Sequence, residues 1–323
     1  MPCKQLDLMS YQSFLINWFH RRVSYRSLQR LSFLTTTKSN SATPLLLNGC
    51  NFAPSKRQKM KLKDSTILIT GGTSGIGLEF VKQLTEEGAN IIVTGRNIDA
   101  LKATKSKFPK IQIFQSDVSK PKDIEDLYTQ VTKQYPDLNI IINNAGIMRN
   151  LDLQDASLDL ENVTSEIAIN LSGTIQMNHQ FIPHLKTKSS SAIVNLSSGL
   201  AFLPFPLSPV YSAAKSGIHA YSQVLRLQLK NTNVKVFELA PPATKTTLMN
   251  AFSNDLDDDS AGPVMKVEKM VGIAINGLLN DNYEIKPGMS KALYVMGRIA
   301  PRFFLNYMHK TIEKAKEKKR NKK

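Results

Sequence analysis

Cysteine is scarce in this chain. Its 323 residues include two cysteines, Cys3 and Cys50, and both precede the first predicted strand. The main part of the sequence therefore has neither disulfides nor thiolate metal ligands. His179 and His184 are five residues apart, so they do not share the helix face that a His-x-x-x-His zinc site uses. The sequence predicts no metal site.

Long apolar runs are also missing. Residues 1–59 lack the uninterrupted apolar core of a secretory signal. Arg298 and Arg302 interrupt the apolar stretch at 292–305, which therefore does not predict a membrane-spanning helix. No internal repeat is visible, and the chain is long enough to form one domain with a buried core.

Positive charge is concentrated at the two ends of the chain. Of the formal net charge of +16, residues 1–59 carry +8 and residues 310–323 carry +6, which leaves +2 for the part between them. That part shows no basic groove interleaved with stacking aromatic residues. We therefore expect no nucleic-acid partner.

Two interpretations apply to the N-terminal residues 1–59. They are basic, rich in Ser and Thr and nearly free of acidic residues, which suits a mitochondrial transit peptide. Alternatively, Met60 is the true start, because the segment that it begins leads directly into the first predicted strand. We favour the second interpretation, and with it a cytoplasmic protein.

The basic C-terminal residues 310–323 also allow two interpretations. The simpler one is a solvated tail that is partly without fixed structure. The other is attraction to an anionic membrane surface, assisted by residues 292–305. The expected organisation is thus a leader at 1–59, one domain at 60–309 and a basic tail at 310–323.

A glycine-rich turn follows the first predicted strand, at 65–70. Residues 71–77 include four glycines, and the segment after them has apolar residues every four positions, as a helix does. Pyrophosphate binds at such a turn, because glycine lets the backbone approach closely and the first helical N–H groups carry partial positive charge. Glycines also serve ordinary tight turns, so the turn alone is weak support for a nucleotide site.

The strands that follow strengthen this interpretation. Short apolar runs at 90–94, 111–115, 139–142, 192–196 and 234–239 are separated by segments of helix length, and 283–288 is a candidate edge strand. Such alternation predicts an α/β fold, a Rossmann-type doubly wound parallel sheet with helices on both faces. Ligands of such sheets bind outside the carboxyl ends of the strands.

Tyr211 and Lys215 are the most informative pair of side chains. They are four residues apart, and on a helix this spacing puts both on one face. A fixed positive charge favours the phenolate, so we expect Lys215 to lower the pKa of Tyr211 from its usual value of about 10. Together with Ser198 and the glycine turn, the pair indicates hydride-transfer chemistry with an acid or base.

From about residue 60 to residue 247, several separated motifs jointly resemble the short-chain dehydrogenase/reductase family. Residues 70–77 match its Thr-Gly-x-x-x-Gly-x-Gly turn, residues 143–146 its Asn-Asn-Ala-Gly element, and Tyr211 with Lys215 its Tyr-x-x-x-Lys pair. The sequences of residues 197–202 and 241–243 are similar to those of one branch of this family, which the bacterial DltE-like oxidoreductases represent.

The resemblance implies an enzyme that interconverts a carbonyl and an alcohol. In the direction of reduction, Tyr211 is expected to donate the proton, and Ser198, thirteen residues before it, to hydrogen-bond the developing oxyanion. Lys215 is expected to bind the nicotinamide ribose, and Asn170 to hold a water of a proton relay. The alternative is a nucleotide-binding regulatory or scaffold protein of the same fold without turnover.

The resemblance also implies a set of cofactor contacts. Gly95 stands where NAD-preferring relatives carry aspartate and Arg96 follows it, so NADP(H) is favoured, with NAD(H) second. The alternatives are that Arg96 is a solvated surface residue and Asp117 an ordinary cap or turn residue. The expected contacts are Gly71, Thr73, Ser74, Gly75, Ile76, Gly77, Arg96, Asp117, Val118, Asn144, Ala145, Gly146, Tyr211, Lys215 and Thr246.

The sequence departs from the family pattern at two places, one beside a cofactor contact and one that concerns the shape of the substrate. Pro241-Pro242 replaces the usual Pro-Gly, which removes a backbone N–H beside the expected cofactor contact Thr246. The glycine-rich terminal strand of common bacterial reductases is missing, so substrate shape cannot be inferred from those relatives.

The substrate signal itself is apolar. The loop between Ser198 and Tyr211 carries Phe202, Leu203, Phe205 and Leu207, which favours a lipophilic ketone, aldehyde or alcohol; alternatively, these side chains pack the loop or a subunit contact. We expect the acidic segment at 248–267 to be flexible, and the resemblance implies that it closes over the substrate. A homodimer or homotetramer packed through the helices that bear Asn170 and Tyr211 is also implied by the resemblance.

Overall fold

Residues 60–246, 248 and 264–320 are described by the computed structural model, with only the backbone described at 318–320. The predicted leader at 1–59 and most of the acidic segment at 248–267 lie outside the described residues.

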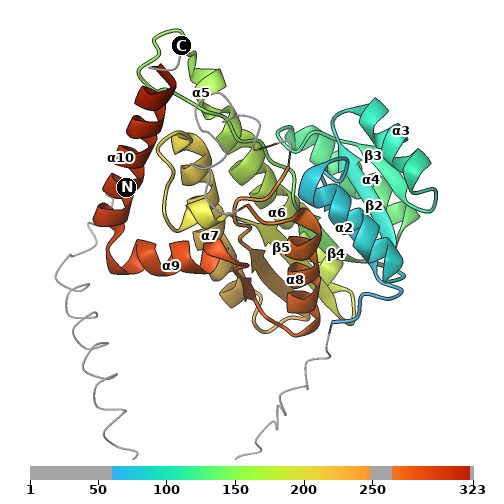
Figure 1. Ribbon diagram of the computed structural model, residues 1–323. Coiled ribbons are helices and arrows are strands. Elements are labelled where there is room, and N and C mark those ends of the chain that lie inside the picture. The colour runs from blue at the N-terminus through green and yellow to red at the C-terminus, as the bar shows by residue number, and fades with distance from the viewer. Residues whose placement is uncertain (1–59, 247, 249–263, 321–323) are drawn as a thin grey trace, which may run out of the picture. The chain divides into compact units, whose positions relative to one another are not determined.

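Seven parallel strands in the described part of the chain form a sheet in the order β3-β2-β1-β4-β5-β6-β7 (Figure 1). They are β1 (Thr66–Thr70), β2 (Asn90–Gly95), β3 (Gln112–Gln115), β4 (Leu138–Asn143), β5 (Ser191–Leu196), β6 (Val234–Leu239) and β7 (Glu284–Ile285). Each of the six longer strands was predicted to within one residue at either end. The edge strand β7 is shorter than predicted, because only two residues pair with β6.

Helices cover both faces of this sheet, as the α/β alternation predicts. They are α2 (Gly75–Glu86), α3 (Ile98–Lys107), α4 (Pro121–Gln134), α5 (Leu160–Ile167), α6 (Gly173–Lys186), α7 (Pro209–Gln228) and α8 (Val267–Leu279). The apolar core on one face is built from the strands with α2 and α8, and the core on the other from the strands with α4, α6 and α7. Ile67 and Ile69 of β1 belong to the first core and Leu68 to the second, because successive side chains of a strand point to opposite faces.

Two further helices, α9 (Met289–Ile299) and α10 (Pro301–Arg320), follow β7. The expected boundary at residue 310 lies inside α10, so residues 310–320 are helical and not a tail without fixed structure. The physical reason is twofold: Lys, Glu, Ala and Arg form helices readily, and Ile312, which is 4% exposed, anchors the helix to the domain. No helix of the described residues has both the length and the apolarity needed to cross a bilayer.

The topology determines where a ligand can bind. Strand order reverses between β1 and β4, since the chain runs outward from β1 to β3 and then returns to the other side of β1. The helices after β1 and β4 therefore leave on opposite faces, and a crevice opens at the carboxyl ends of these two strands. The glycine turn and the Asn-Asn-Ala-Gly element follow those two strand ends directly.

Candidate active site

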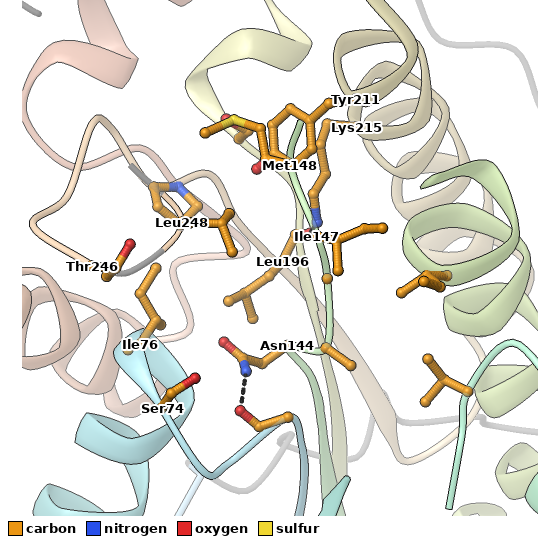
Figure 2. Close-up of a pocket in the computed structure, with 18 of the residues that line it drawn as sticks. Ser74, Ile76, Asn144, Ile147, Met148, Leu196, Tyr211, Lys215, Thr246 and Leu248 are labelled. Atoms are coloured by element: carbon orange, nitrogen blue, oxygen red, sulfur yellow. Dashed lines mark hydrogen bonds between the residues drawn. The ribbon is translucent and has the colours of Figure 1, made fainter. Parts of the chain in front are cut away.

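A cavity of about 490 Å³ lies at the carboxyl ends of the strands. It is bounded by the segments that follow β1, β2, β3, β4, β5 and β6, and by the start of α7. Figure 2 shows part of its lining, with Tyr211 and Lys215 near one end and Ser74 near the other. The predicted site residues that line it are Gly71, Thr73, Ser74, Gly75, Ile76, Arg96, Asp117, Val118, Asn144, Ala145, Gly146, Ser198, Tyr211, Lys215 and Thr246. Gly77 and Asn170 do not line it.

The glycine turn brings the start of α2 to the cavity wall. Gly71 and Gly75 adopt φ of +65° and +52°, a region that residues with a Cβ avoid. Ser74 precedes the helix in an extended conformation, and its side chain makes no capping hydrogen bond to the first turn. The first N–H groups of α2 thus have no side-chain partner at this end, which makes the turn suited to an anion.

Gly77 acts through packing and not through the cavity. A Cβ atom at this position would lie 2.3 Å from the Gly71 carbonyl oxygen and 2.5 Å from Asn144 Nδ2. Such distances require the backbone to move, so glycine is needed for the helix to approach the turn. Its predicted role in cofactor binding is therefore indirect.

The Asn-Asn-Ala-Gly element joins the end of β4 to the end of β1. Asn144 Nδ2 donates to the carbonyls of Thr70 (2.9 Å) and Gly71 (3.0 Å), and Figure 2 draws one bond of this amide. The backbone N–H groups of Asn144 and Ala145 donate to Thr70 Oγ1, each at 3.0 Å. These bonds hold the two sides of the crevice at a fixed separation.

Arg96 and Asp117 lie at the end of the cavity formed by β2 and β3. Arg96 is exposed, so it is both a surface residue and part of the lining. Partial burial opposes the ionisation of Asp117, but hydrogen bonds from the backbone N–H and hydroxyl of Ser119 and the nearby Arg96 charge outweigh it and lower the pKa of Asp117. Asp117 is thus a turn residue, as the alternative interpretation has it, and also lines the cavity.

Ser198, Tyr211 and Lys215 meet at the other end. Ser198 Oγ accepts a hydrogen bond from Leu200 N (3.1 Å), and the Ser198 hydroxyl lies close enough to the Tyr211 phenol to affect its pKa. Lys215 Nζ lies 5.6 Å from the centroid of the Tyr211 ring and donates to the Leu196 carbonyl at 2.8 Å. All three residues are buried, and the spacing prediction for α7 is confirmed.

The pKa of Tyr211 differs from the sequence-based expectation. Burial raises it to about 12; the nearby Ser198 hydroxyl opposes this shift and the negative charge of Glu166 reinforces it. Burial also lowers the pKa of Lys215 to about 8. The expected lowering by Lys215 does not dominate, because desolvation of the phenolate is the larger effect and the ammonium is hydrogen-bonded to Leu196. The Tyr211 phenol is therefore neutral at pH 7.

Asn170 lies in a π-helical turn, η2 (Ala168–Ser172), between α5 and α6. Its fully buried side chain accepts from Ile147 N (2.9 Å) through Oδ1 and donates to the Ile147 carbonyl (2.8 Å) through Nδ2. π-Helical turns often occur at functional sites. Here the turn holds in place the segment after β4, which lines the cavity with Ile147 and Met148.

Sequence reasoning missed Glu166. Its carboxylate is fully buried, accepts from Arg149 N (2.8 Å) through Oε1 and lies 3.9 Å from the Arg149 guanidinium through Oε2. Burial raises the pKa of Glu166, although the hydrogen bond and charge of Arg149 oppose this. One signal was available: a residue four positions before Asn170 lies on the same helix face.

The apolar loop contributes less to the cavity than expected. Of the four side chains predicted to contact the substrate, Phe202, Leu203, Phe205 and Leu207, only Phe205 lines the cavity. Leu203 is fully buried, Phe202 packs on Tyr294 with ring centroids 5.1 Å apart, and Leu207 packs against Ile312. Phe202, Leu203 and Leu207 therefore pack within the protein, as the alternative interpretation of this loop predicts, and do not face the cavity. Sequence reasoning did not anticipate that Ile147, Met148, Leu196 and Leu200 would supply apolar lining.

Pro241 and Pro242 are buried and line the cavity next to Thr246. The Pro241 carbonyl accepts from Gly199 N (2.9 Å), and the Pro242 carbonyl accepts from the Thr244 hydroxyl (2.8 Å). A Cβ at Gly75 would lie 3.3 Å from Thr246, so this segment approaches the glycine turn closely across the cavity. Within the described ranges, no three His, Cys, Asp or Glu side chains gather as metal ligands do.

Proteins of similar sequence are known. The family model described as short chain dehydrogenase matches residues 65–257. An oxidoreductase of Bacillus subtilis strain 168, named DltE and described as uncharacterized, is 41% identical over 196 residues, which are 61% of this chain and 77% of the relative.

Two solved structures are similar to this fold. A short chain dehydrogenase/reductase from Burkholderia phymatum, in complex with NAD, has a TM-score of 0.65 at 16% identity and covers 72% of this chain and 93% of its own. A short-chain dehydrogenase from Sphingobium yanoikuyae, in complex with NADPH, has a TM-score of 0.61 at 25% identity and covers 68% and 86%. With the matched motifs and the parallel sheet, these findings show that the chain belongs to the short-chain dehydrogenase/reductase family of NAD(P)-dependent oxidoreductases, in its DltE-like branch.

Proposed function

We propose that this protein is an NADP(H)-dependent oxidoreductase that interconverts a carbonyl and an alcohol on an apolar substrate, with Tyr211 as the acid and base. The observation that carries the proposal is one cavity with two different ends. One end is the uncapped start of α2, and the other is a protonated Tyr211 phenol beside Ser198.

The residues of the cavity fit a nicotinamide dinucleotide. Gly71, Ser74 and Gly75 form an anion-binding turn, and Arg96 and Asp117 lie where an adenosine end would be held. Thr94 also lines the cavity, and its buried hydroxyl has no hydrogen-bond partner among the described residues.

Each catalytic side chain has a defined task in this proposal. When bound, the nicotinamide cofactor supplies or accepts the hydride. In reduction, Tyr211 donates its proton to the carbonyl oxygen, and Ser198 donates a second hydrogen bond to the same oxygen as negative charge develops there. Lys215 stabilises the phenolate that remains, since its ammonium lies on the same helix face one turn away. Asn170 holds the segment with Ile147 and Met148 in position.

The substrate end of the cavity is mainly apolar. Met148, Leu200, Phe205 and Leu248 line it near Tyr211 and Ser198. A lipophilic ketone or aldehyde buries its apolar part against these side chains, while the two hydroxyls bind its oxygen.

The test of the proposed function is NADPH consumption with a panel of lipophilic ketones and aldehydes. We expect turnover that rises with the apolar area of the substrate. The rival function is an NADP-binding regulatory or scaffold protein; tight NADPH binding without turnover for any member of the panel would favour it. The carboxyl-end cavity alone does not separate the two, whereas the intact Ser198, Tyr211 and Lys215 favour an enzyme.

Arg96 is expected to set the preference for NADP(H). Arg96→Gln removes a guanidinium that can make a charge-assisted bond to the 2′-phosphate, so the KM for NADPH is expected to rise about tenfold, with little change for NADH. Steady-state kinetics with both cofactors measure this. The matched control is Lys102→Gln, which removes an exposed charge on α3 outside the cavity. An equal loss with NADPH and NADH would contradict the assignment.

Glu166 is expected to influence the pH dependence of alcohol oxidation. Its negative charge raises the pKa of Tyr211, so Glu166→Gln lowers that pKa. Oxidation requires Tyr211 as a base, so the rate rises with pH and the rising limb should move to lower pH in the variant. The pH profile of kcat measures the shift. Glu238→Gln, a second buried carboxyl that does not act on Tyr211, should leave the limb unchanged.

We also propose a homodimer or homotetramer that packs through α6 and α7. Val224 and Leu227 on α7 are 55% and 68% exposed, which supports an apolar contact there. Light scattering of the purified chain should give a mass of two or four chains, and a monomer would contradict the proposal.

A further inference from the structure

The helices α9 and α10, which meet at a sharp bend at Ala300, both carry exposed apolar side chains. Val295 and Ile299 lie four residues apart on α9 and are 45% and 76% exposed, and Phe303 and Tyr307 lie four residues apart on α10 and are each 65% exposed. We call these four residues the α9–α10 face. Figure 1 shows both helices on the opposite side of the molecule from α3 and β3. A face of this kind is uncommon on the surface of a monomer and indicates an interaction site.

The inner sides of α9 and α10 pack against the rest of the domain. In α9, Tyr294 packs on Phe202, and a Cβ at Gly297 would lie 2.0 Å from the Phe202 carbonyl oxygen. In α10, Ile312 is buried and packs with Leu207. The domain therefore holds both helices through side chains that point away from the α9–α10 face. The exposed residues are not needed for that packing.

The sequence around the α9–α10 face is strongly basic. Residues 289–323 contain eleven Lys and Arg against two Glu, a net charge of +9. Arg298 and Arg302 lie between the apolar residues of the face and are exposed; the Arg298 guanidinium stacks 4.3 Å from the Tyr294 ring centroid. The occupant of the face must therefore accept apolar side chains and many positive charges together.

We propose that the α9–α10 face docks this protein on the surface of an anionic lipid bilayer. A bilayer surface takes apolar side chains into the boundary below the headgroups, while anionic headgroups attract the lysines and arginines around them. A second copy of the same face is the wrong occupant, because it brings +9 against +9. A nucleic acid matches the charge but leaves Val295 and Ile299 without apolar partners.

Docking has a consequence for the cavity. Phe205 and Met148 line the cavity and pack with Met308 and Ile312 of α10 on their other side. The helix that contacts the lipid is therefore the helix behind the substrate end of the cavity. Delivery of a lipophilic substrate from the bilayer rests on the proposed function; docking itself does not.

Vesicle co-sedimentation of the full chain tests the proposal. The vesicles are phosphatidylcholine alone, or phosphatidylcholine with about one third phosphatidylserine. We expect binding to the anionic vesicles only, weakened by salt. Ile299→Ser/Phe303→Ser should weaken it about tenfold or more, because two apolar side chains no longer insert. Arg298→Gln/Arg302→Gln should weaken it to a similar extent, at about fivefold per charge.

The matched control is Leu160→Ser, which removes an apolar side chain on α5 that is 87% exposed; its vesicle binding should equal that of the wild type. NADPH affinity and the melting temperature of each variant show that the fold is intact. Because residues 1–59 are also basic, the α9–α10 variants decide the outcome. Binding by both double variants equal to the wild type, or no binding by the wild type, overturns the proposal. So does a wild-type dimer that Ile299→Ser/Phe303→Ser converts to a monomer, since the face would then be a self-interface.

Discussion

Tyr211→Phe is expected to lower kcat for carbonyl reduction by about 10²–10⁴-fold. The phenol has a pKa raised to about 12 by burial, so it is protonated at neutral pH, and in the proposed mechanism it is the proton donor. Phenylalanine keeps the ring and its packing but has no proton to give. Because the substitution removes one hydroxyl, the affinity for NADPH and the melting temperature should change little. Single-turnover NADPH oxidation and a fluorescence titration with NADPH measure the two effects separately.

The matched control is Tyr221→Phe on the same helix. The Tyr221 phenol is also largely buried, is hydrogen-bonded to Asn178, and has a pKa raised by burial, but it does not line the cavity. Its loss should leave kcat within about threefold of the wild type. Equal rates for wild type and Tyr211→Phe would defeat the proposed mechanism. An equal loss in both variants would show that the phenols act through folding.

Lys215→Met should separate catalysis from stability. We expect kcat to fall by about 10²–10³-fold, since the phenolate that forms during reduction loses the cation beside it. The ammonium is buried and its pKa is lowered from 10.5 to about 8. Below pH 8 this burial costs about 3 kcal/mol of folding free energy. Methionine removes that cost but leaves the Leu196 carbonyl without its donor, at about 1–3 kcal/mol. The melting temperature at pH 7 should therefore stay the same or rise.

The lowered pKa of Lys215 also determines how the free energy of unfolding changes with pH. Between about pH 8 and 10.5 the folded state binds fewer protons at Lys215 than the unfolded state, because the folded pKa is the lower one. The contribution of this group to the free energy of unfolding therefore rises with pH across that window. Denaturant unfolding at several pH values should show this rise in the wild type and not in Lys215→Met. The raised pKa of Tyr211 acts in the opposite direction above pH 10 in both proteins.

Lys235→Met is the control for a buried lysine elsewhere. The Lys235 side chain is 4% exposed and pairs with Asp281 at 2.7 Å, and neither residue lines the cavity. Its removal leaves Asp281 without that ion-pair partner, so stability should fall while kcat stays near the wild-type value. A Lys215→Met protein with the kcat of the wild type would contradict the role of Lys215.

Much of the site could be predicted from the sequence, because it depends on short-range patterns. The alternation of apolar runs predicted six strands to within one residue at each end. The glycine turn after β1 follows from two residues that need positive φ, Gly71 and Gly75. The four-residue spacing of Tyr211 and Lys215 places both on one face of α7. Each of these inferences needs only neighbours in the chain and the geometry of a helix, a strand or a turn.

Other properties depend on residues that are distant in the sequence. The pKa of Tyr211 rises because the phenol is buried and because Glu166, on another helix, carries a negative charge. Phe202 and Leu207 turn from the cavity to pack on α9 and α10, which arrive about a hundred residues later in the chain. The helical form of 310–320 likewise rests partly on the burial of Ile312.

The sequence by itself thus determined the family, the order of the strands along the chain and the spacing that brings Tyr211 and Lys215 to one face of α7. The tertiary structure alone decided which apolar side chains face the cavity, how burial shifts the pKa values of Tyr211 and Lys215, and which side of α9 and α10 is left exposed. The reason is physical: spacing along a helix or strand is a local property. Burial and electrostatic environment are sums over every segment that packs nearby, and only the folded chain brings those segments together.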